Sequence, residues 1–177
     1  KNNHEGKVAC YIKALCEVEP AIFGITIVTA AGEVYEVGDS KELVSIQSIS
    51  KVFTAAKVMQ ERGDSFVREK IGTNATGAPF NSIIAIEQHH GSASNPLVNA
   101  GAIQTTSWVE AKNSEERWLK IKKNMDTFAG RELPFNQKVY LSEVSDNKRN
   151  QAISKILDAY GRIGSDPLEA TTVYTKQ

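Results

Sequence analysis

The sequence has little of several features that would mark particular classes of protein. Lys and Arg number 21, and so do Asp and Glu, so the formal net charge is zero. Without a net positive charge, the chain has no overall field that would attract nucleic acid or an anionic membrane surface. The longest apolar stretch, residues 21–31, has about half of the ~20 residues that a membrane helix needs. We therefore expect neither a nucleic-acid partner nor a membrane partner.

Cysteine and histidine are also scarce. The two cysteines, Cys10 and Cys16, are too few for a secreted disulfide framework, and their spacing matches neither a C-x-x-C redox motif nor a zinc site. We interpret them as two small core or surface residues. His89 and His90 have no further ligand at a metal-binding spacing, so we expect no metal site. The sequence begins at Lys1 without a signal-like segment, and we expect a reducing, cytoplasmic location.

Hydrophobic periodicity predicts a helix, a hairpin and a second helix in the first third of the chain. Residues 6–16 have apolar side chains at helical spacing, whereas 21–29 and 34–37 are typical of two strands joined by a turn that ends at Gly32. From Ser48 the apolar residues recur at a spacing of three to four until Arg62. Gly63, a natural helix stop, follows.

The rest of the chain is predicted to be helical, after two long loops. Residues 72–82 and 88–98 are dense in Gly, Asn, Ser and Pro, and long ordered loops of this kind often form sites. After Asn99 the pattern is helical, with breaks at 132–136 and 161–167. Asn113 and Glu116 are typical of a capping box, which starts a helix.

Ser48 and Lys51 form the sharpest chemical motif. They are three residues apart on the first turn of a predicted helix, so their side chains lie on one face and can touch. A serine hydroxyl becomes a nucleophile when a neighbouring base takes its proton, and a desolvated lysine can be that base. Backbone N–H groups at a helix start can also hold an oxyanion. By itself, the motif is weak and fits a helix cap followed by a solvated lysine better than a catalytic pair.

Longer blocks of sequence resemble the signature blocks of the serine-dependent glutaminases, most closely the bacterial enzymes. The resemblance covers nearly the whole chain, and several blocks are specific. The blocks are Phe23–Ile25, Gly38–Ser40, Ser45–Phe53, Gly77–Ser82, Asn95–Ile103, Glu143 with Asn150, and Tyr174–Gln177.

The resemblance implies an α+β fold of the serine β-lactamase/DD-peptidase type. It implies that residues 1–177 form the N-terminal portion of the catalytic domain, with the C-terminal strands of the sheet absent. Residues 1–47 would supply a helix and the β-hairpin of the sheet, and 48–177 the mainly helical part. A later tyrosine for proton transfer and a second oxyanion donor would lie beyond the Tyr174–Gln177 block.

The resemblance also assigns roles to single residues. Ser48 matches the nucleophile and Lys51 its lysine partner. The remaining matches are substrate-binding positions, namely Tyr11, Gln47, Asn99, Glu143, Asn150 and Tyr174, together with Ser48 itself. These types suit L-glutamine, because a carboxylate such as that of Glu143 pairs with the α-ammonium and neutral amides and hydroxyls bind the α-carboxylate.

The implied reaction is hydrolysis of L-glutamine to L-glutamate and ammonia through a serine acyl-enzyme. An oxyanion donor would contribute on the order of 100 to 1000-fold, and proton transfer ~100 to 10,000-fold. No metal or organic cofactor is needed. The family resemblance suggests a homo-oligomer, a dimer or tetramer.

Several residues retain simpler interpretations. Glu143 fits a surface carboxylate, Asn99 a helix cap, and Tyr174 a core aromatic. Asn150 would share a helical face with Glu143 unless residues 145–147 interrupt the helix. Two other functions also stay open. One is an acyl-serine hydrolase of the same fold that acts on peptides or β-lactams, and the other is a non-catalytic assembly module.

Overall fold

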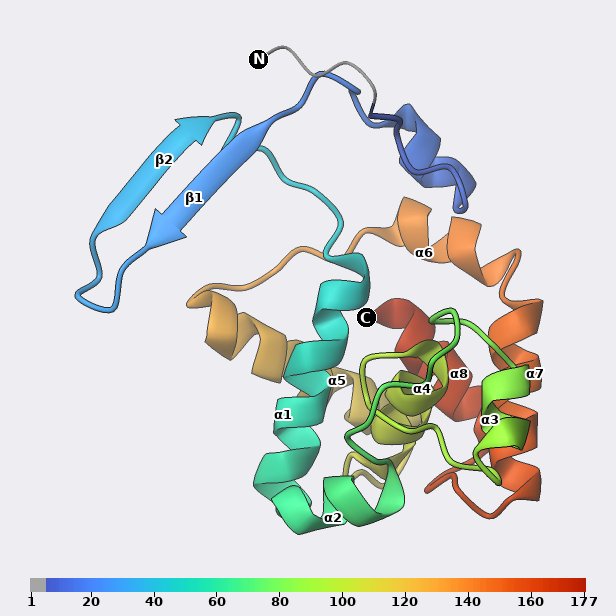
Figure 1. Cartoon of the computed structure of the whole chain (residues 1–177). Helices are drawn as coiled ribbons and strands as arrows, with labels where there is room; N and C mark the ends of the chain where they lie inside the picture. Colours follow the sequence, from blue (N-terminus) through green and yellow to red (C-terminus); the bar gives the residue numbers. More distant parts are fainter. Residues whose placement is uncertain (1–5) are drawn as a thin grey trace. The chain divides into compact units, whose positions relative to one another are not determined.

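The computed structural model describes residues 6–177, which divide into two compact units (Figure 1). The first, which we call the hairpin unit, contains the described residues up to Ser45 together with Asn136–Glu143. The second, the helical unit, contains Ile46–Phe135 and Val144–Gln177. No helix of the described part is long and apolar enough to cross a membrane.

The hairpin unit is built around two antiparallel strands, as predicted. Strand β1 (Gly24–Val28) pairs with β2 (Val34–Gly38), and Ile27 lies opposite Tyr35. The turn closes where the Gly32 N–H donates to the Thr29 carbonyl, 2.9 Å away. Gly32 has a φ of 85° there, which glycine adopts readily. Together with the mostly helical second unit, this hairpin confirms the predicted α+β class.

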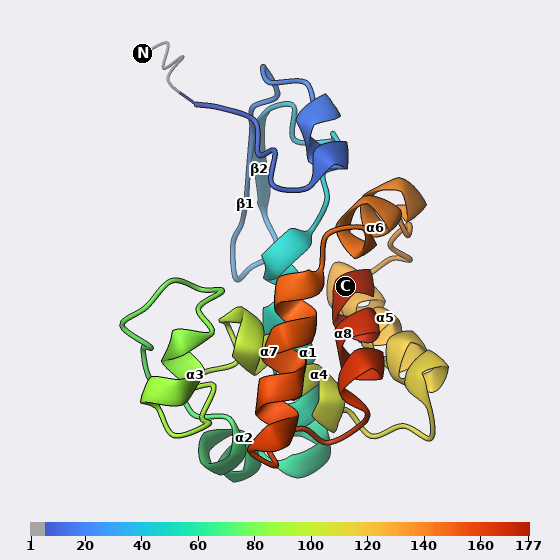
Figure 2. The same cartoon turned by 90° about the vertical axis from the view of Figure 1, so that its right-hand side faces the viewer.

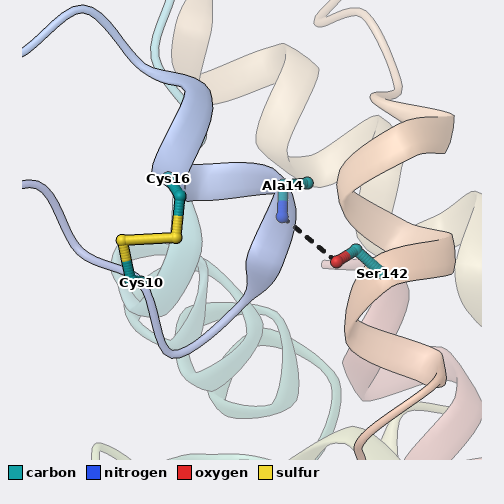
Figure 3. Close-up of a disulfide and its surroundings, with 4 residues drawn as sticks. All are labelled: Cys10, Ala14, Cys16 and Ser142. Atoms are coloured by element: carbon teal, nitrogen blue, oxygen red, sulfur yellow. Dashed lines mark hydrogen bonds between the residues drawn. A yellow bond between two sulfur atoms is a disulfide. The ribbon is translucent and has the colours of Figure 1, made fainter.

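The predicted helix over 6–16 is wrong, and so is our interpretation of the cysteines. Only Lys13–Glu17 is helical, as the short 3-10 helix η1, because Ile12 before it is extended. Cys10 and Cys16 are joined by a disulfide with their Cα atoms 4.8 Å apart (Figure 3). An α-helix would separate residues six apart by about 9 Å along its axis. The chain therefore doubles back, and a helix through both cysteines is excluded.

Helix α6 (Gln137–Val144) contributes most of its length to the hairpin unit, although it lies far away in sequence. The Ala14 N–H donates to Ser142 Oγ at 3.2 Å, and Lys138 forms an ion pair with Glu17. Figure 3 shows the Ala14 amide directed at Ser142 on α6. These contacts place the disulfide-closed loop against α6.

The helical unit contains most of the helices predicted from periodicity. Its elements are η2 (Gln47–Ile49), α1 (Ser50–Arg62), α2 (Asp64–Lys70), α3 (Ile84–Gln88), α4 (Asn99–Trp108), α5 (Ser114–Ala129), α7 (Lys148–Ala159) and α8 (Pro167–Lys176). The predicted end of α1 before Gly63 is confirmed. Helix α2, one of the short helices, was not predicted, because its seven residues show too little apolar periodicity.

Helix α4 is the central element of this unit and packs against α1, α7 and α8 (Figure 2). Nine of its ten residues are buried, including Gln104 and Thr106 with no exposed surface. Buried polar side chains need hydrogen-bond partners. Gln104 Nε2 donates to the Lys70 carbonyl at 2.8 Å, and Thr105 Oγ1 to the Gly101 carbonyl at 2.6 Å. Such bonds allow a polar sequence to form a buried helix.

Two apolar clusters pack around these helices. The first contains Val58, Val67, Ile71, Val109, Trp118, Ile121, Met125 and Val173. The second contains Ile86, Ala93, Ala100, Ile103, Ile153, Leu157 and Ala170. Because α8 contributes to both clusters, it joins the α1–α5 side of the unit to the α4–α7 side.

Local signals locate the helix ends well. Asn113 Oδ1 accepts the Glu116 N–H at 2.9 Å, and this bond confirms the predicted start of α5. Gly130 ends that helix with a left-handed φ of 65°. Residues 145–147 separate α6 from α7, so Glu143 and Asn150 do not lie on one helix. The interruption considered for residues 145–147 is therefore present, and the two side chains share no helical face.

Candidate active site

Ser48 lies in the 3-10 helix η2, which leads directly into α1. The preceding residue, Gln47, has a φ of 47°. This is the left-handed region, which costs a non-glycine residue ~1–3 kcal/mol and is found at active sites more often than elsewhere. Ser48 is exposed at this turn. The strained turn thus presents a serine at the amino end of a helix.

Lys51 follows on the first turn of α1 and is only 2% exposed. Its Nζ donates a hydrogen bond to Asn99 Oδ1 at 2.8 Å. The same Nζ lies 5.9 Å from the ring centre of Phe80 and 6.0 Å from that of Tyr174. These contacts hold the ammonium inside the helical unit rather than in solvent.

Asn99 is the hub of this cluster. Its Oδ1 accepts from Lys51 and also from the Tyr174 hydroxyl, at 3.1 Å. Its Nδ2 donates to Asn150 Oδ1 at 3.2 Å. Because both donors reach the oxygen and an acceptor faces the nitrogen, these bonds assign the orientation of the amide. Four of the predicted site residues, from α1, α4, α7 and α8, thus meet at one place.

The loop before α4 sets the position of Asn99. The Asn99 N–H donates to the Phe80 carbonyl at 2.8 Å. The N-cap of α4 is Val98, and Asn99 is the first residue of the helix. The interpretation of Asn99 as a simple cap is therefore wrong. A Cβ at Gly101 would lie 1.7 Å from the Asn95 carbonyl oxygen, so only glycine lets the loop approach the helix. The glycine in this block is thus required by packing.

A second polar cluster, which sequence reasoning missed, holds the same helices together. Thr54 Oγ1 donates to Gln177 Oε1 at 2.6 Å, and Gln177 Nε2 donates to Thr106 Oγ1 at 2.8 Å. Thr54 and Thr106 are buried to 1% and 0% exposure. One glutamine therefore connects α1, three residues beyond Lys51, with α4. A threonine in a predicted helix gives no sequence signal that it links two helices by a hydrogen bond. Only the Tyr174–Gln177 block could have indicated Gln177.

Tyr11 and Glu143, the other two predicted substrate-binding residues, both lie in the hairpin unit. Tyr11 is 69% exposed, on the loop that the disulfide closes. Partial burial of its hydroxyl raises the pKa of Tyr11, and the negative charge of Glu143 raises it further. The carboxylate of Glu143 therefore acts on the Tyr11 phenol within this unit.

Among residues 6–177 no group of three or more His, Cys, Asp or Glu side chains is placed to hold a metal ion. The Lys51 cluster instead contains an ammonium, amides and a phenol, which donate and accept hydrogen bonds. An exposed serine lies one turn before this cluster along the chain. The arrangement suits acyl transfer, with the serine as nucleophile and the lysine as proton carrier.

Comparison with known proteins identifies relatives over the whole described chain. The family model "Glutaminase" matches residues 6–177. A glutaminase of Mycobacterium ulcerans is 42% identical over 177 residues, which are all of this chain and 55% of that protein. The chain thus spans a little over half the length of the curated relatives it matches.

Solved structures agree. A probable glutaminase with 42% identity superposes with a TM-score of 0.94, covering 97% of this chain and 55% of the other. A probable glutaminase of Bacillus subtilis, solved as a complex with 6-diazo-5-oxo-L-norleucine, is 27% identical with a TM-score of 0.83, covering 97% of this chain and 51% of the other.

Proposed function

The chain belongs to the glutaminase family, and we propose that it forms the nucleophile-bearing part of an enzyme that hydrolyses L-glutamine to L-glutamate and ammonia. The observation that carries the proposal is the hydrogen-bonded cluster of Lys51, Asn99, Asn150 and Tyr174 one turn beyond Ser48. The Bacillus subtilis relative binds a diazo-ketone analogue of an amino acid. An electrophile of that kind suits a site with a nucleophile.

In the proposed first step Ser48 Oγ attacks the side-chain amide carbonyl of glutamine. Lys51 takes the serine proton and passes it to the leaving nitrogen, so that ammonia departs and a γ-glutamyl ester remains. Water then attacks the ester by the same proton path, which releases glutamate and restores the hydroxyl. The position of Lys51 supports this role, since it is buried on the first turn of α1, three residues beyond Ser48.

Substrate recognition is proposed to divide by charge. Glu143 would pair with the α-ammonium, and its neighbour Tyr11 would line the rim of the pocket. The side-chain amides of Gln47, Asn99 and Asn150 would donate to the substrate's carboxylate or amide oxygens. Tyr174, whose hydroxyl donates to Asn99, would contact the substrate through its ring and its hydroxyl oxygen. Neutral donors suit this task because they add no competing base to the site.

The proposal extends to architecture and setting. We propose a serine β-lactamase-like fold in which residues 1–47 supply part of a sheet and 48–177 the helical part of an N-terminal portion. The exposed strands β1 and β2 support it, because a two-stranded sheet is marginal alone. A cytoplasmic homo-oligomer that needs no cofactor is the accompanying expectation, supported by the family membership. Light scattering and cell fractionation test these two points.

The decisive experiment measures ammonia release from L-glutamine by the protein at the full length of its relatives, with Ser48→Ala beside Ser50→Ala. Loss of the nucleophile is expected to lower kcat by at least ~1000-fold, whereas the Ser50 variant keeps its activity. Equal rates in the Ser48 variant and the parent would contradict the proposal. The same assay on residues 1–177 alone shows whether this part suffices.

A chemical test separates the open alternatives without turnover. 6-Diazo-5-oxo-L-norleucine is expected to label Ser48, and peptide mass spectrometry locates the label. A fluorescent β-lactam that acylates Ser48 while the diazo-ketone does not would instead indicate a hydrolase of the β-lactam-recognising kind. If neither reagent labels the full-length protein, a non-catalytic assembly module becomes the better reading.

A further inference from the structure

The disulfide between Cys10 and Cys16 closes a loop of seven residues on the surface of the hairpin unit (Figure 3). Both cysteines are exposed, and they are the only cysteines of the chain. Their Cα separation of 4.8 Å lies within the range of protein disulfides. An exposed disulfide is open to attack by small thiols, because thiol exchange requires access to a sulfur atom.

The loop carries a residue of the proposed site and rests on the helix that carries another. Tyr11 is the residue next to Cys10, and Glu143 follows Ser142, the acceptor of the Ala14 N–H on α6. Ile12 and Leu15 of the same loop are 6% and 7% exposed. One face of the loop is therefore packed, while the sulfur atoms stay accessible.

Hydrogen bonds and packing also hold this loop in shape. Its regular structure is the 3-10 helix η1, and its links to α6 include the Ala14 bond to Ser142 and, just beyond Cys16, the exposed Glu17–Lys138 ion pair. Exposed ion pairs contribute little. The disulfide adds a covalent restraint one residue away from Tyr11.

We propose that Cys10 and Cys16 form a reversible redox site, in which the disulfide holds Tyr11 beside Glu143 on α6 and its reduction releases the loop. The effect on glutamine binding rests on the proposed function, whereas the redox site itself does not. In a reducing compartment a persistent structural disulfide is unusual, and disulfides that form there are mostly transient. An accessible pair beside substrate-binding residues fits the transient kind.

The chemistry is ordinary thiol exchange. The thiolate of a small thiol such as glutathione attacks one cysteine sulfur, the S–S bond breaks, and the other cysteine leaves as a thiolate that takes up a proton. A second thiolate attacks the outer sulfur of the mixed disulfide and releases the first cysteine as a thiol. The protein gains two electrons and two protons, and the two small thiols become one disulfide. Oxidised glutathione drives the reverse reaction, which re-forms the disulfide.

The first test titrates the full-length protein with mixtures of reduced and oxidised glutathione. Free thiols are alkylated at each ratio, and mass spectrometry counts the label on the peptide that contains residues 10–16. We expect the bond to open and re-form within the ratios that living cells span. The redox site would be overturned if both cysteines were free thiols at every ratio, or if the disulfide never opened.

The second test follows the loop itself by hydrogen exchange. Reduction is expected to speed exchange at the Ala14 amide, and a Cys10→Ser/Cys16→Ser variant should exchange at the reduced rate under all conditions. Ser142→Ala is the matched control for docking, because it removes the acceptor and leaves both thiols intact. An Ala14 exchange rate that is the same in both redox states would overturn the release of the loop.

The third test measures glutamine kinetics in both redox states. Reduction should raise KM several-fold and leave kcat within a factor of two, since Tyr11 lies away from the reacting bond in our assignment. The double serine variant should match the reduced enzyme and ignore glutathione. Equal KM values would overturn the coupling to substrate. If no glutaminase activity is found at all, the thiol titration and the exchange rates still decide the redox site.

Discussion

The two strands of the hairpin unit and the core helices of the helical unit contain similar apolar residues but differ in how far they expose them. In β1 and β2 every residue is exposed, including Ile27 at 58% and Tyr35 at 56%. In the helical unit Ile103 and Ile153 have no exposed surface. An antiparallel sheet normally packs one face on a core. The helical unit therefore contains its own apolar core, whereas the apolar side chains of β1 and β2 are exposed.

The Lys51 cluster lies in the unit that is packed on its own. Its members come from α1, α4, α7 and α8, and the two apolar clusters also draw on these helices. Buried packing restricts side-chain rotamers, so hydrogen-bond partners on such helices are held in place before substrate arrives. The difference between the units is therefore also a difference between a packed, hydrogen-bonded cluster and a pair of exposed strands.

The largest expected effect comes from removing a core side chain in the helical unit. Ile153→Ala in α7 should lower the free energy of unfolding by about 2–5 kcal/mol, since it leaves a cavity in a fully buried cluster. Ile27→Ala in β1 should change it by less than about 0.5 kcal/mol, because that side chain is already in solvent. Denaturant unfolding of the chain measures both. Similar losses of unfolding free energy in the two variants would contradict the contrast between the buried helices and the exposed strands.

A smaller effect is expected from the polar connection between α1 and α4. Gln177→Ala removes the side-chain partner that Thr54 and Thr106 share and should cost about 2 kcal/mol of unfolding free energy, since two buried hydrogen bonds are lost. It should also lower kcat in the full-length enzyme, because Thr54 lies three residues beyond Lys51. Gln60→Ala on the exposed side of α1 is the control. A Gln177 variant as stable as that control would contradict the role.

The hairpin's apolar face should affect association rather than folding. Ile25 and Ile27 lie opposite Val37 and Tyr35 in the β1–β2 register, so these four side chains share one exposed face. Ile25→Thr with Ile27→Thr should reduce self-association of the chain in light scattering, since less apolar surface meets water. Its unfolding free energy should stay within about 0.5 kcal/mol of the parent. Unchanged scattering would argue that this face drives no association.

The smallest effect is a pH dependence at the start of α5. The pKa of the Glu116 carboxyl is lowered first by the hydrogen bond that it accepts from the Lys112 N–H. The side-chain hydrogen bond and the positive charge of Lys120 lower it further. A lowered folded-state pKa means that the stabilisation is present above the unfolded pKa and is lost as pH falls through the folded one. Glu116→Gln should therefore destabilise at neutral pH and match the parent in acid.

The control for this effect is Asn113→Ala. That variant removes the N-cap amide, which does not titrate, so its cost of ~1 kcal/mol should persist at both pH values. Unfolding curves of the three proteins at neutral and acid pH provide the measurement. A Glu116→Gln deficit that stays the same in acid would contradict the assigned cause of the pKa shift.

Local signals allowed much of the fold to be predicted. The hairpin turn at Gly32, the end of α1 at Gly63 and the cap at Asn113 each depend on residues within four positions of one another. The N-terminal segment was predicted wrongly for the opposite reason. Its apolar spacing favours a helix, but the Cys10–Cys16 bond and the docking on α6 prevail over that weak preference.

The sequence by itself determined the hairpin, most of the longer helices and the family, and so named Ser48 and Lys51 as candidates. Only the tertiary structure decided what surrounds them. Asn99 meets Lys51, Asn150 and Tyr174 across 48, 51 and 75 positions, and Gln177 meets Thr54 across 123. Caps and turns are local and can be read along the chain, whereas these contacts depend on how four helices pack, which no short stretch of sequence specifies.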